Sequence, residues 1–175
     1  MSGRRHVQQA HERAQVAIFL EWFNRCYRSQ FRVIAEPNPP EAVVQSGKTV
    51  RWVEVSTAFW SDEYAQDEYS YVTPGEKHRP ISKGPFVNVD AQFSRRFVSV
   101  VKKKLEKKSY LPCKAKYGPG YLVIPILFPF FDGRTYSKMR EEWSHASIND
   151  LGCFRAAFIT FRSLNGTRVQ RWSLS

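Results

Sequence analysis

Apolar side chains recur at helical spacing near the start of the chain. Between residues 7 and 28, Val16, Phe19 and Phe23 lie on one stripe, which predicts an amphipathic helix. One turn before Val16 the same stripe reaches Glu12. We therefore expect this helix to carry a carboxylate in line with its apolar side.

The spacing of apolar residues also predicts the other elements: helical spacing indicates further helices, and alternation of apolar and polar residues indicates strands. Residues 31–36 predict a short strand, and residues 42–45 and 49–57 predict a hairpin that turns at Ser46, Gly47 and Lys48. Residues 121–128 are almost wholly apolar, which is typical of a strand buried on both faces, and we expect it beside the hairpin. The other expected elements are helices at residues 62–71, 90–108 and 135–148, and strands at residues 154–162 and 169–173 with a turn at Asn165 and Gly166.

This order of elements predicts an α/β fold with a central mixed β-sheet flanked by helices. The chain has 175 residues, a length typical of one domain. We expect a single domain over residues 1–175, with a core at about residues 7–128 and a C-terminal helix and hairpin at residues 135–175.

Composition narrows the class of protein. Hydrophobic residues make up 42% of the chain, which excludes a disordered protein. The chain has no apolar run of the roughly 20 residues needed to span a bilayer, and its N-terminus lacks the apolar stretch of a signal peptide. Three cysteines lie far apart without a Cys-x-x-Cys pair, so we expect them to be reduced. These features predict a soluble cytoplasmic or otherwise intracellular protein with no membrane partner.

Positive charge is concentrated in one part of the chain. The net charge is +11, and residues 95–116 hold nine Lys and Arg against one Glu. Such a surface favours nucleic acid as the partner, and DNA over RNA, although a solvated helix side is the alternative. The residues expected to contact nucleic acid are Arg95, Arg96, Lys102, Lys103, Lys107 and Lys108.

Two glutamates fall where the predicted hairpin brings its strands together. Glu54 lies within the apolar second strand, and Glu41 stands directly before the first. Two adjacent carboxylates repel each other, and a divalent cation with oxygen ligands, Mg²⁺ or Mn²⁺, would relieve that repulsion. Alternatively, either glutamate pairs at the sheet surface with a cation, for which Arg32, Lys48 and Arg51 are available.

The order of these segments resembles the restriction-endonuclease-like PD-(D/E)XK nuclease superfamily. The resemblance covers residues 10–128 and rests on Glu12 in the first helix, Pro39-Pro40-Glu41 at a strand start, Arg51-Trp52-Val53-Glu54-Val55 in the next strand, the basic helix and the strand Tyr121-Leu122-Val123-Ile124. It implies that Glu41 and Glu54 are metal ligands, that the Val55 carbonyl completes the inner shell, and that Glu12 acts through water.

The chain departs from the family pattern at two positions. Glu41 stands where the family has an aspartate, and Ser56 stands where it has a lysine that orients the attacking water. Some members of the superfamily have this lysine on the neighbouring helix. There Lys104 lies close to the apolar stripe and is the candidate, unless its stem only covers apolar surface while the ammonium reaches water.

Together these features predict a Mg²⁺- or Mn²⁺-dependent nuclease that hydrolyses phosphodiesters. Two alternatives stay open: a nucleic-acid-binding module that has lost catalysis on the same fold, and a basic structural or assembly protein. A homo-oligomeric contact through the apolar segment at residues 127–132 is also open.

Overall fold

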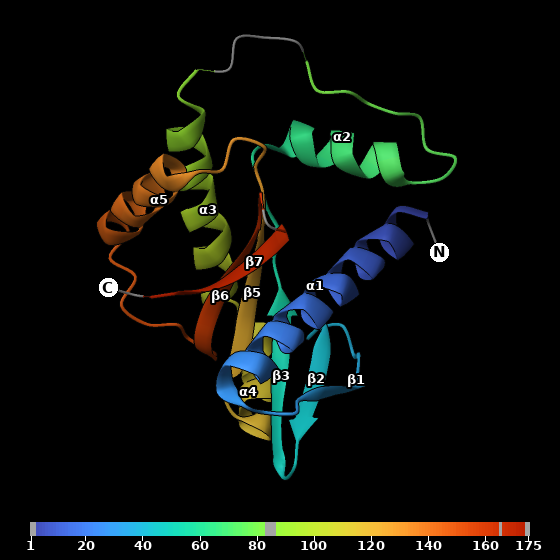
Figure 1. Cartoon of the computed structure of the whole chain (residues 1–175), viewed down its shortest axis with the longest axis vertical. Coiled ribbons are helices and arrows are strands. Elements are labelled where there is room, and N and C mark those ends of the chain that lie inside the picture. The colour runs from blue at the N-terminus through green and yellow to red at the C-terminus, as the bar shows by residue number, and fades with distance from the viewer. Residues whose placement is uncertain (1–2, 83–86, 165, 174–175) are drawn as a thin grey trace.

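A computed structural model describes residues 3–82, 87–164 and 166–173 as a single α/β domain with an open mixed sheet (Figure 1). The helices are α1 (Gly3–Tyr27), α2 (Asp62–Val72), α3 (Val89–Leu105), α4 (Leu111–Tyr117) and α5 (Gly133–His145), with a 3₁₀ turn at Lys108–Tyr110. The strands are β1 (Arg32–Ala35), β2 (Ala42–Ser46), β3 (Thr49–Val55), β4 (Ala58–Phe59), β5 (Gly120–Leu127), β6 (Phe154–Ser163) and β7 (Gly166–Trp172). The predicted α/β class and mixed sheet are confirmed.

The sheet has the strand order β1-β2-β3-β5-β6-β7, with β4 paired to β5 beyond the end of β3. Strands β1, β2 and β3 form an antiparallel meander, β3, β5 and β6 run parallel, and β7 returns antiparallel to β6. The expected position of β5 beside the hairpin is therefore confirmed. Because β6 pairs with β5 and α5 packs against α3, the C-terminal segments are continuous with the rest of the sheet.

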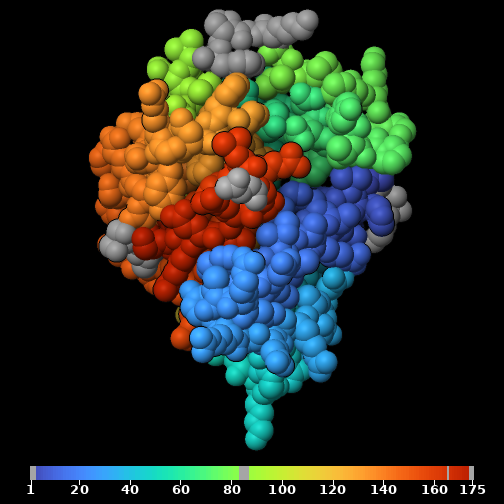
Figure 2. Space-filling model, viewed as in Figure 1, coloured from blue at the N-terminus to red at the C-terminus, as the bar shows by residue number. Residues whose placement is uncertain are grey.

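Helices cover both faces of this sheet (Figure 1). Helix α1 buries Val16, Phe19 and Phe23 against the face that carries Val53 and Val55. The opposite face, which includes Trp52, packs against α3 and α5. Figure 2 shows α1 crossing its face of the molecule with α2 beside its N-terminal end and β7 along its flank. Side chains of β3 therefore alternate between the face covered by α1 and the face covered by α3 and α5.

Pro125 is tolerated within the central strand because of where the neighbouring strands end. The pairing of β3 with β5 stops at Val123, and β4 takes it up again at Ile126. The Ser56 N–H donates to the Val123 carbonyl, so the backbone groups of Val123 and of every second residue after it in β5 are directed toward β3. Pro125 is one of these residues, and it lies in the gap between the end of the β3 pairing and the start of the β4 pairing. The missing N–H of Pro125 therefore removes no bond to β3 or β4.

The basic helix differs from the prediction at its C-terminal end. Helix α3 ends at Leu105 rather than near residue 108, and the chain turns through Lys108–Tyr110 into α4, which was not predicted. Gly152 lies directly against the Leu105 carbonyl, since a Cβ there would come within 2.5 Å of that oxygen. Pro112 then occupies the first turn of α4, where a proline costs no hydrogen bond.

Within the described part of the chain, no helix is both long enough and apolar enough to cross a bilayer. All three cysteines, Cys26, Cys113 and Cys153, are free, as expected. The turn predicted at Asn165 falls partly outside the described residues.

Candidate active site

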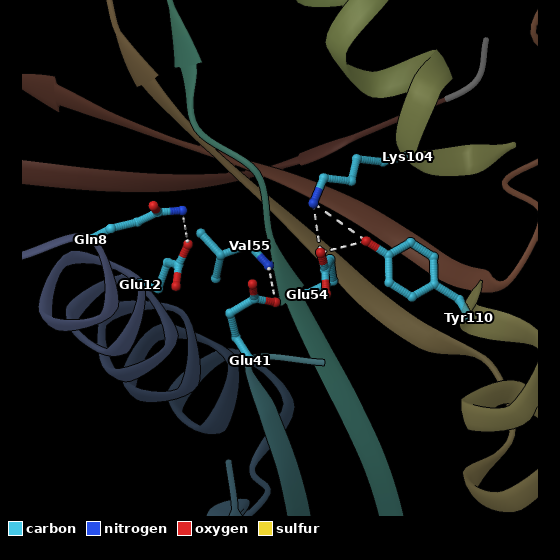
Figure 3. Close-up of polar contacts among 7 residues, drawn as sticks. All are labelled: Gln8, Glu12, Glu41, Glu54, Val55, Lys104 and Tyr110. Carbon is cyan, nitrogen blue, oxygen red and sulfur yellow. Dashed lines mark hydrogen bonds and ion pairs between the residues drawn. The ribbon is translucent and has the colours of Figure 1, made fainter. Parts of the chain in front are cut away.

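A cleft of about 550 Å³ lies where the end of β3 meets α1 and the C-terminal end of α3. Its lining includes Glu12, Glu41, Glu54 and Lys104, so the structure brings together the four side chains predicted as catalytic (Figure 3). The hairpin register explains the pairing: Ala42 stands opposite Val53, and one step further the chain places Glu41 across from Glu54. Val55, the third predicted ligand, lines the same cleft.

Glu54 is the buried floor of the cleft and is only 1% exposed. Lys104 Nζ lies 2.6 Å from Glu54 Oε1, and the Tyr110 hydroxyl donates to the same oxygen. Burial and then the Glu54 carboxylate raise the pKa of Tyr110, which keeps that hydroxyl a donor. Among the described residues, Glu54 Oε2 is a buried oxygen with no hydrogen-bond partner. One carboxylate oxygen therefore accepts two hydrogen bonds, and the proton that Glu41 can share is the donor that remains for the rest of the carboxylate.

Glu41 stands at the start of β2 on the opposite side of the cleft floor from Tyr110 (Figure 3). Its Oε2 accepts the Val55 N–H at 3.2 Å. Burial, the proton that Glu41 can share with Glu54 and the charge of Glu54 raise the pKa of Glu41 to about 8, against the weaker opposing effect of the Val55 N–H. Glu41 therefore keeps its proton to a higher pH than an exposed glutamate does, because it is buried beside Glu54.

Glu12 contributes a third carboxylate from α1. Gln8, one turn earlier, donates to Glu12 Oε1 at 2.9 Å. Burial raises the pKa of Glu12, with the Gln8 hydrogen bond opposing it and the Glu54 charge adding to it. The predicted inward direction of Glu12 is borne out, because it shares the cleft with Glu41 and Glu54.

Lys104 points inward from α3. Helical spacing places it on the side of Phe97 and Val101, both buried, and its side chain is 25% exposed. Its ammonium contacts the buried Glu54 carboxylate, so the side chain does more than cover apolar surface. Surface pairing of the glutamates is not seen in the described residues either, since Arg51 instead donates to the backbone carbonyls of Val50 and Tyr117.

The six residues expected to contact nucleic acid do not lie on one surface. Only Lys107 of the six lines the cleft. Arg95, Lys102 and Lys103 are exposed on the outer side of α3, away from Phe97. Arg96 forms an ion pair with Asp62, and Lys102 lies near Glu106. The prediction treated the basic segment as one surface, whereas helical geometry divides it between the cleft and the outer side.

The sequence did not identify several residues that line the cleft, nor Tyr110, which is buried and supports the floor of the cleft through Glu54. Tyr110 carries no pattern that separates it from the end of a basic helix, because its position depends on the turn after Leu105. Helical spacing in α1, by contrast, could have identified Gln8, Arg4 and Arg5. Helix α1 begins at Gly3, and spacing of four residues carries the stripe of Glu12 back to Gln8 and Arg4, with Arg5 beside it.

The donor set of the cleft fits a hard divalent cation better than a soft one. Its acidic groups offer only oxygen, and Glu54 Oε2 is available as a ligand. Within residues 3–82, 87–164 and 166–173, no three His, Cys, Asp or Glu side chains converge closely enough to hold a metal ion by themselves. This finding gives no support to a metal site formed by side chains alone, and metal binding at the cleft stays a prediction.

Comparison with known proteins adds no relative from which a role could be transferred. No family model, no curated protein and no solved structure matches the chain. The function is therefore inferred from the residues of the cleft.

Proposed function

We propose that this protein is a metal-dependent phosphodiesterase that acts on nucleic acid through a restriction-endonuclease-like site. One observation carries the proposal: Glu41 and Glu54 share a buried cleft with an inward lysine, Lys104, supplied by the neighbouring helix. A purely structural core would gain nothing from two neighbouring carboxyl groups when burial, and then the neighbouring Glu54, raises the pKa of Glu41 to about 8.

The arrangement of elements around the cleft supports the same family resemblance. A helix carries Glu12, an antiparallel hairpin carries Glu41 and Glu54, and a second helix carries Lys104 before a strand parallel to β3. The residue at the family's lysine position is Ser56, which also lines the cleft. Lys104 supplies from α3 the charge that Ser56 cannot, which answers the main departure from the family pattern.

Glu41, Glu54 and the backbone of Val55 are the groups that would hold Mg²⁺ or Mn²⁺. Such an ion lowers the pKa of a water and stabilises negative charge on a phosphate. Lys104 adds positive charge to the phosphate that undergoes attack, because its ammonium lies at the cleft floor. Glu12, whose pKa is raised, orients a water from the α1 side through its carboxyl group.

A binding module without catalysis is the second candidate. Lys104 Nζ is engaged by Glu54 at 2.6 Å and also lies 3.3 Å from the Tyr110 hydroxyl. An ammonium held this firmly stabilises Glu54 and is less free to contact a phosphate. In this second function the cleft binds nucleic acid, and Lys104 neutralises a buried carboxylate.

The deciding experiment combines metal binding with cleavage in one pair of variants. We expect Mn²⁺ to raise the Tm of the wild-type protein and of Glu21→Gln, an exposed change on α1, but not of Glu54→Gln. Cleavage of DNA or RNA oligonucleotides should require Mg²⁺ or Mn²⁺ and should be absent in Glu54→Gln. Binding without cleavage across both metals and both nucleic acids would favour the second candidate, and a Mn²⁺ shift that persists in Glu54→Gln would contradict the metal site.

A further inference from the structure

Four cations line the cleft around its acidic floor: Arg4 and Arg5 from α1, and Lys104 and Lys107 from the end of α3 and the residues after it. Lys104 is paired with Glu54. In the part of the chain that the structure describes, Arg4, Arg5 and Lys107 have no carboxylate within ion-pair distance. On the outer side of α3, Lys102 lies near Glu106, whereas Arg95 and Lys103 likewise have no ion pair among the described residues. Unpaired cations therefore lie both at the cleft and on the outer side of α3, but those at the cleft surround the acidic floor.

Aromatic rings hold two of these cations without neutralising them. The Arg4 guanidinium lies 5.3 Å from the centre of the Tyr69 ring, and Lys107 Nζ lies 5.1 Å from the centre of the Tyr110 ring. Cation–π contacts restrict such side chains while their N–H groups stay available to an anion. The two contacts stand on different elements, so a strand running through the cleft would meet positive charge from both.

The size and depth of the cleft limit what can reach its floor. A volume of about 550 Å³ is that of a site for a small molecule or a few nucleotides. The Glu54 side chain is only 2% exposed, so a phosphodiester must enter the cleft to approach it. A strand within a duplex would first have to leave its partner, at a few kcal/mol for each nucleotide.

We propose that the cleft binds single-stranded nucleic acid, with Arg4 and Arg5 on backbone phosphates at the α1 side and Lys107 on a phosphate at the α3 side. This inference rests on the proposed function in taking a phosphodiester as the ligand. Its substrate class is an unpaired strand or end, and the exposed basic side of α3 is not the main contact surface.

The test measures binding separately from cleavage. Glu54→Gln protein is titrated into a labelled 12-nucleotide single strand and into the matching duplex, in EDTA, and fluorescence anisotropy is read at several salt concentrations. We expect the single strand to bind at least 10-fold more tightly than the duplex. Adding Arg4→Gln and Arg5→Gln should weaken binding about 10-fold and reduce the salt slope by about 1.4, or 0.7 for each lost phosphate contact.

The matched control adds Lys102→Gln and Lys103→Gln, which remove the same charge from the outer side of α3 and should change affinity less than about 2-fold. Equal or tighter duplex binding would overturn the proposal, and so would an equal loss from the control pair. Metal-dependent cleavage with duplex preference would refute this inference alone. Single-strand binding that depends on Arg4 and Arg5, without cleavage in the wild type, would support the binding surface and refute the hydrolytic function.

Discussion

Lys104→Met is expected to lower the free energy of unfolding by about 3 kcal/mol, because it removes the cation beside a carboxylate that is 1% exposed. Methionine keeps most of the length and the apolar stem of the side chain, so the change removes the charge with little loss of apolar surface. Glu54 is then left with the Tyr110 hydroxyl as its hydrogen-bond donor. Urea denaturation of the wild type and the variant measures the difference.

Lys103→Met provides the control for this change. The neighbouring lysine is exposed on the outer side of α3, so its loss should alter the free energy of unfolding by less than about 0.5 kcal/mol. The double variant Lys104→Met with Glu54→Gln should recover most of the lost stability, since the amide carries no charge that needs a partner. A double variant as unstable as Lys104→Met would show that the loss comes from packing and would contradict the ion pair as its cause.

Much of the candidate site could be predicted because short-range periodicity controls it. Alternation along β3 separates Glu54 from Val53 and Val55, and the hairpin turn at Gly47 sets the register that brings Glu41 opposite. Helical spacing likewise places Glu12 and Lys104 on inward sides. The positions of Glu12, Glu41 and Glu54 needed only the repeat of one element and the assumption that apolar sides face the sheet, whereas Lys104 was chosen because the family resemblance implies a lysine on this helix.

The rest depends on contacts that no local pattern encodes. Helix α3 ends where Gly152, far along the chain, meets the Leu105 carbonyl, and only that ending brings Tyr110 to Glu54. The separation of Lys107 from Lys102 and Lys103 follows from the same turn. A count of charges along the sequence therefore located the basic segment without showing which of its side chains face the cleft.

The buried ionisable groups of the cleft lower the stability of the folded protein. Three carboxyl groups and one ammonium meet at its floor, and burial raises the pKa of both Glu12 and Glu41. Lys104 and Tyr110 donate to one oxygen of Glu54, and the proton of Glu41 is the donor that remains for the rest of the carboxylate. Titratable groups with shifted pKa values that gather in one cleft are typical of functional sites.

Glu41→Gln should therefore stabilise the protein at pH 8 in EDTA, by on the order of 3 kcal/mol. The pKa of Glu41 is about 8 in the folded protein, against an ordinary value of 4.5, mainly because the group is buried and next because it adjoins Glu54. Between these pH values the folded state binds more protons than the unfolded state. The stability contributed by protonated Glu41 is thus fully present below about pH 4.5 and is lost as the pH rises through 8.

Denaturation at pH 5, 6, 7 and 8 measures this slope, which Glu41→Gln should remove except for the part that Glu12 contributes, and which Glu21→Gln, an exposed change, should leave intact. Addition of Mn²⁺ to the wild type should flatten the slope as well, because a divalent cation favours the deprotonated carboxyl group. A slope that survives Glu41→Gln would assign the pH dependence to another group. A slope that Glu41→Gln removes but Mn²⁺ leaves unchanged would confirm Glu41 as the source of the pH dependence and contradict its role as a metal ligand. The same measurement therefore tests both the destabilising effect of Glu41 and its proposed metal binding.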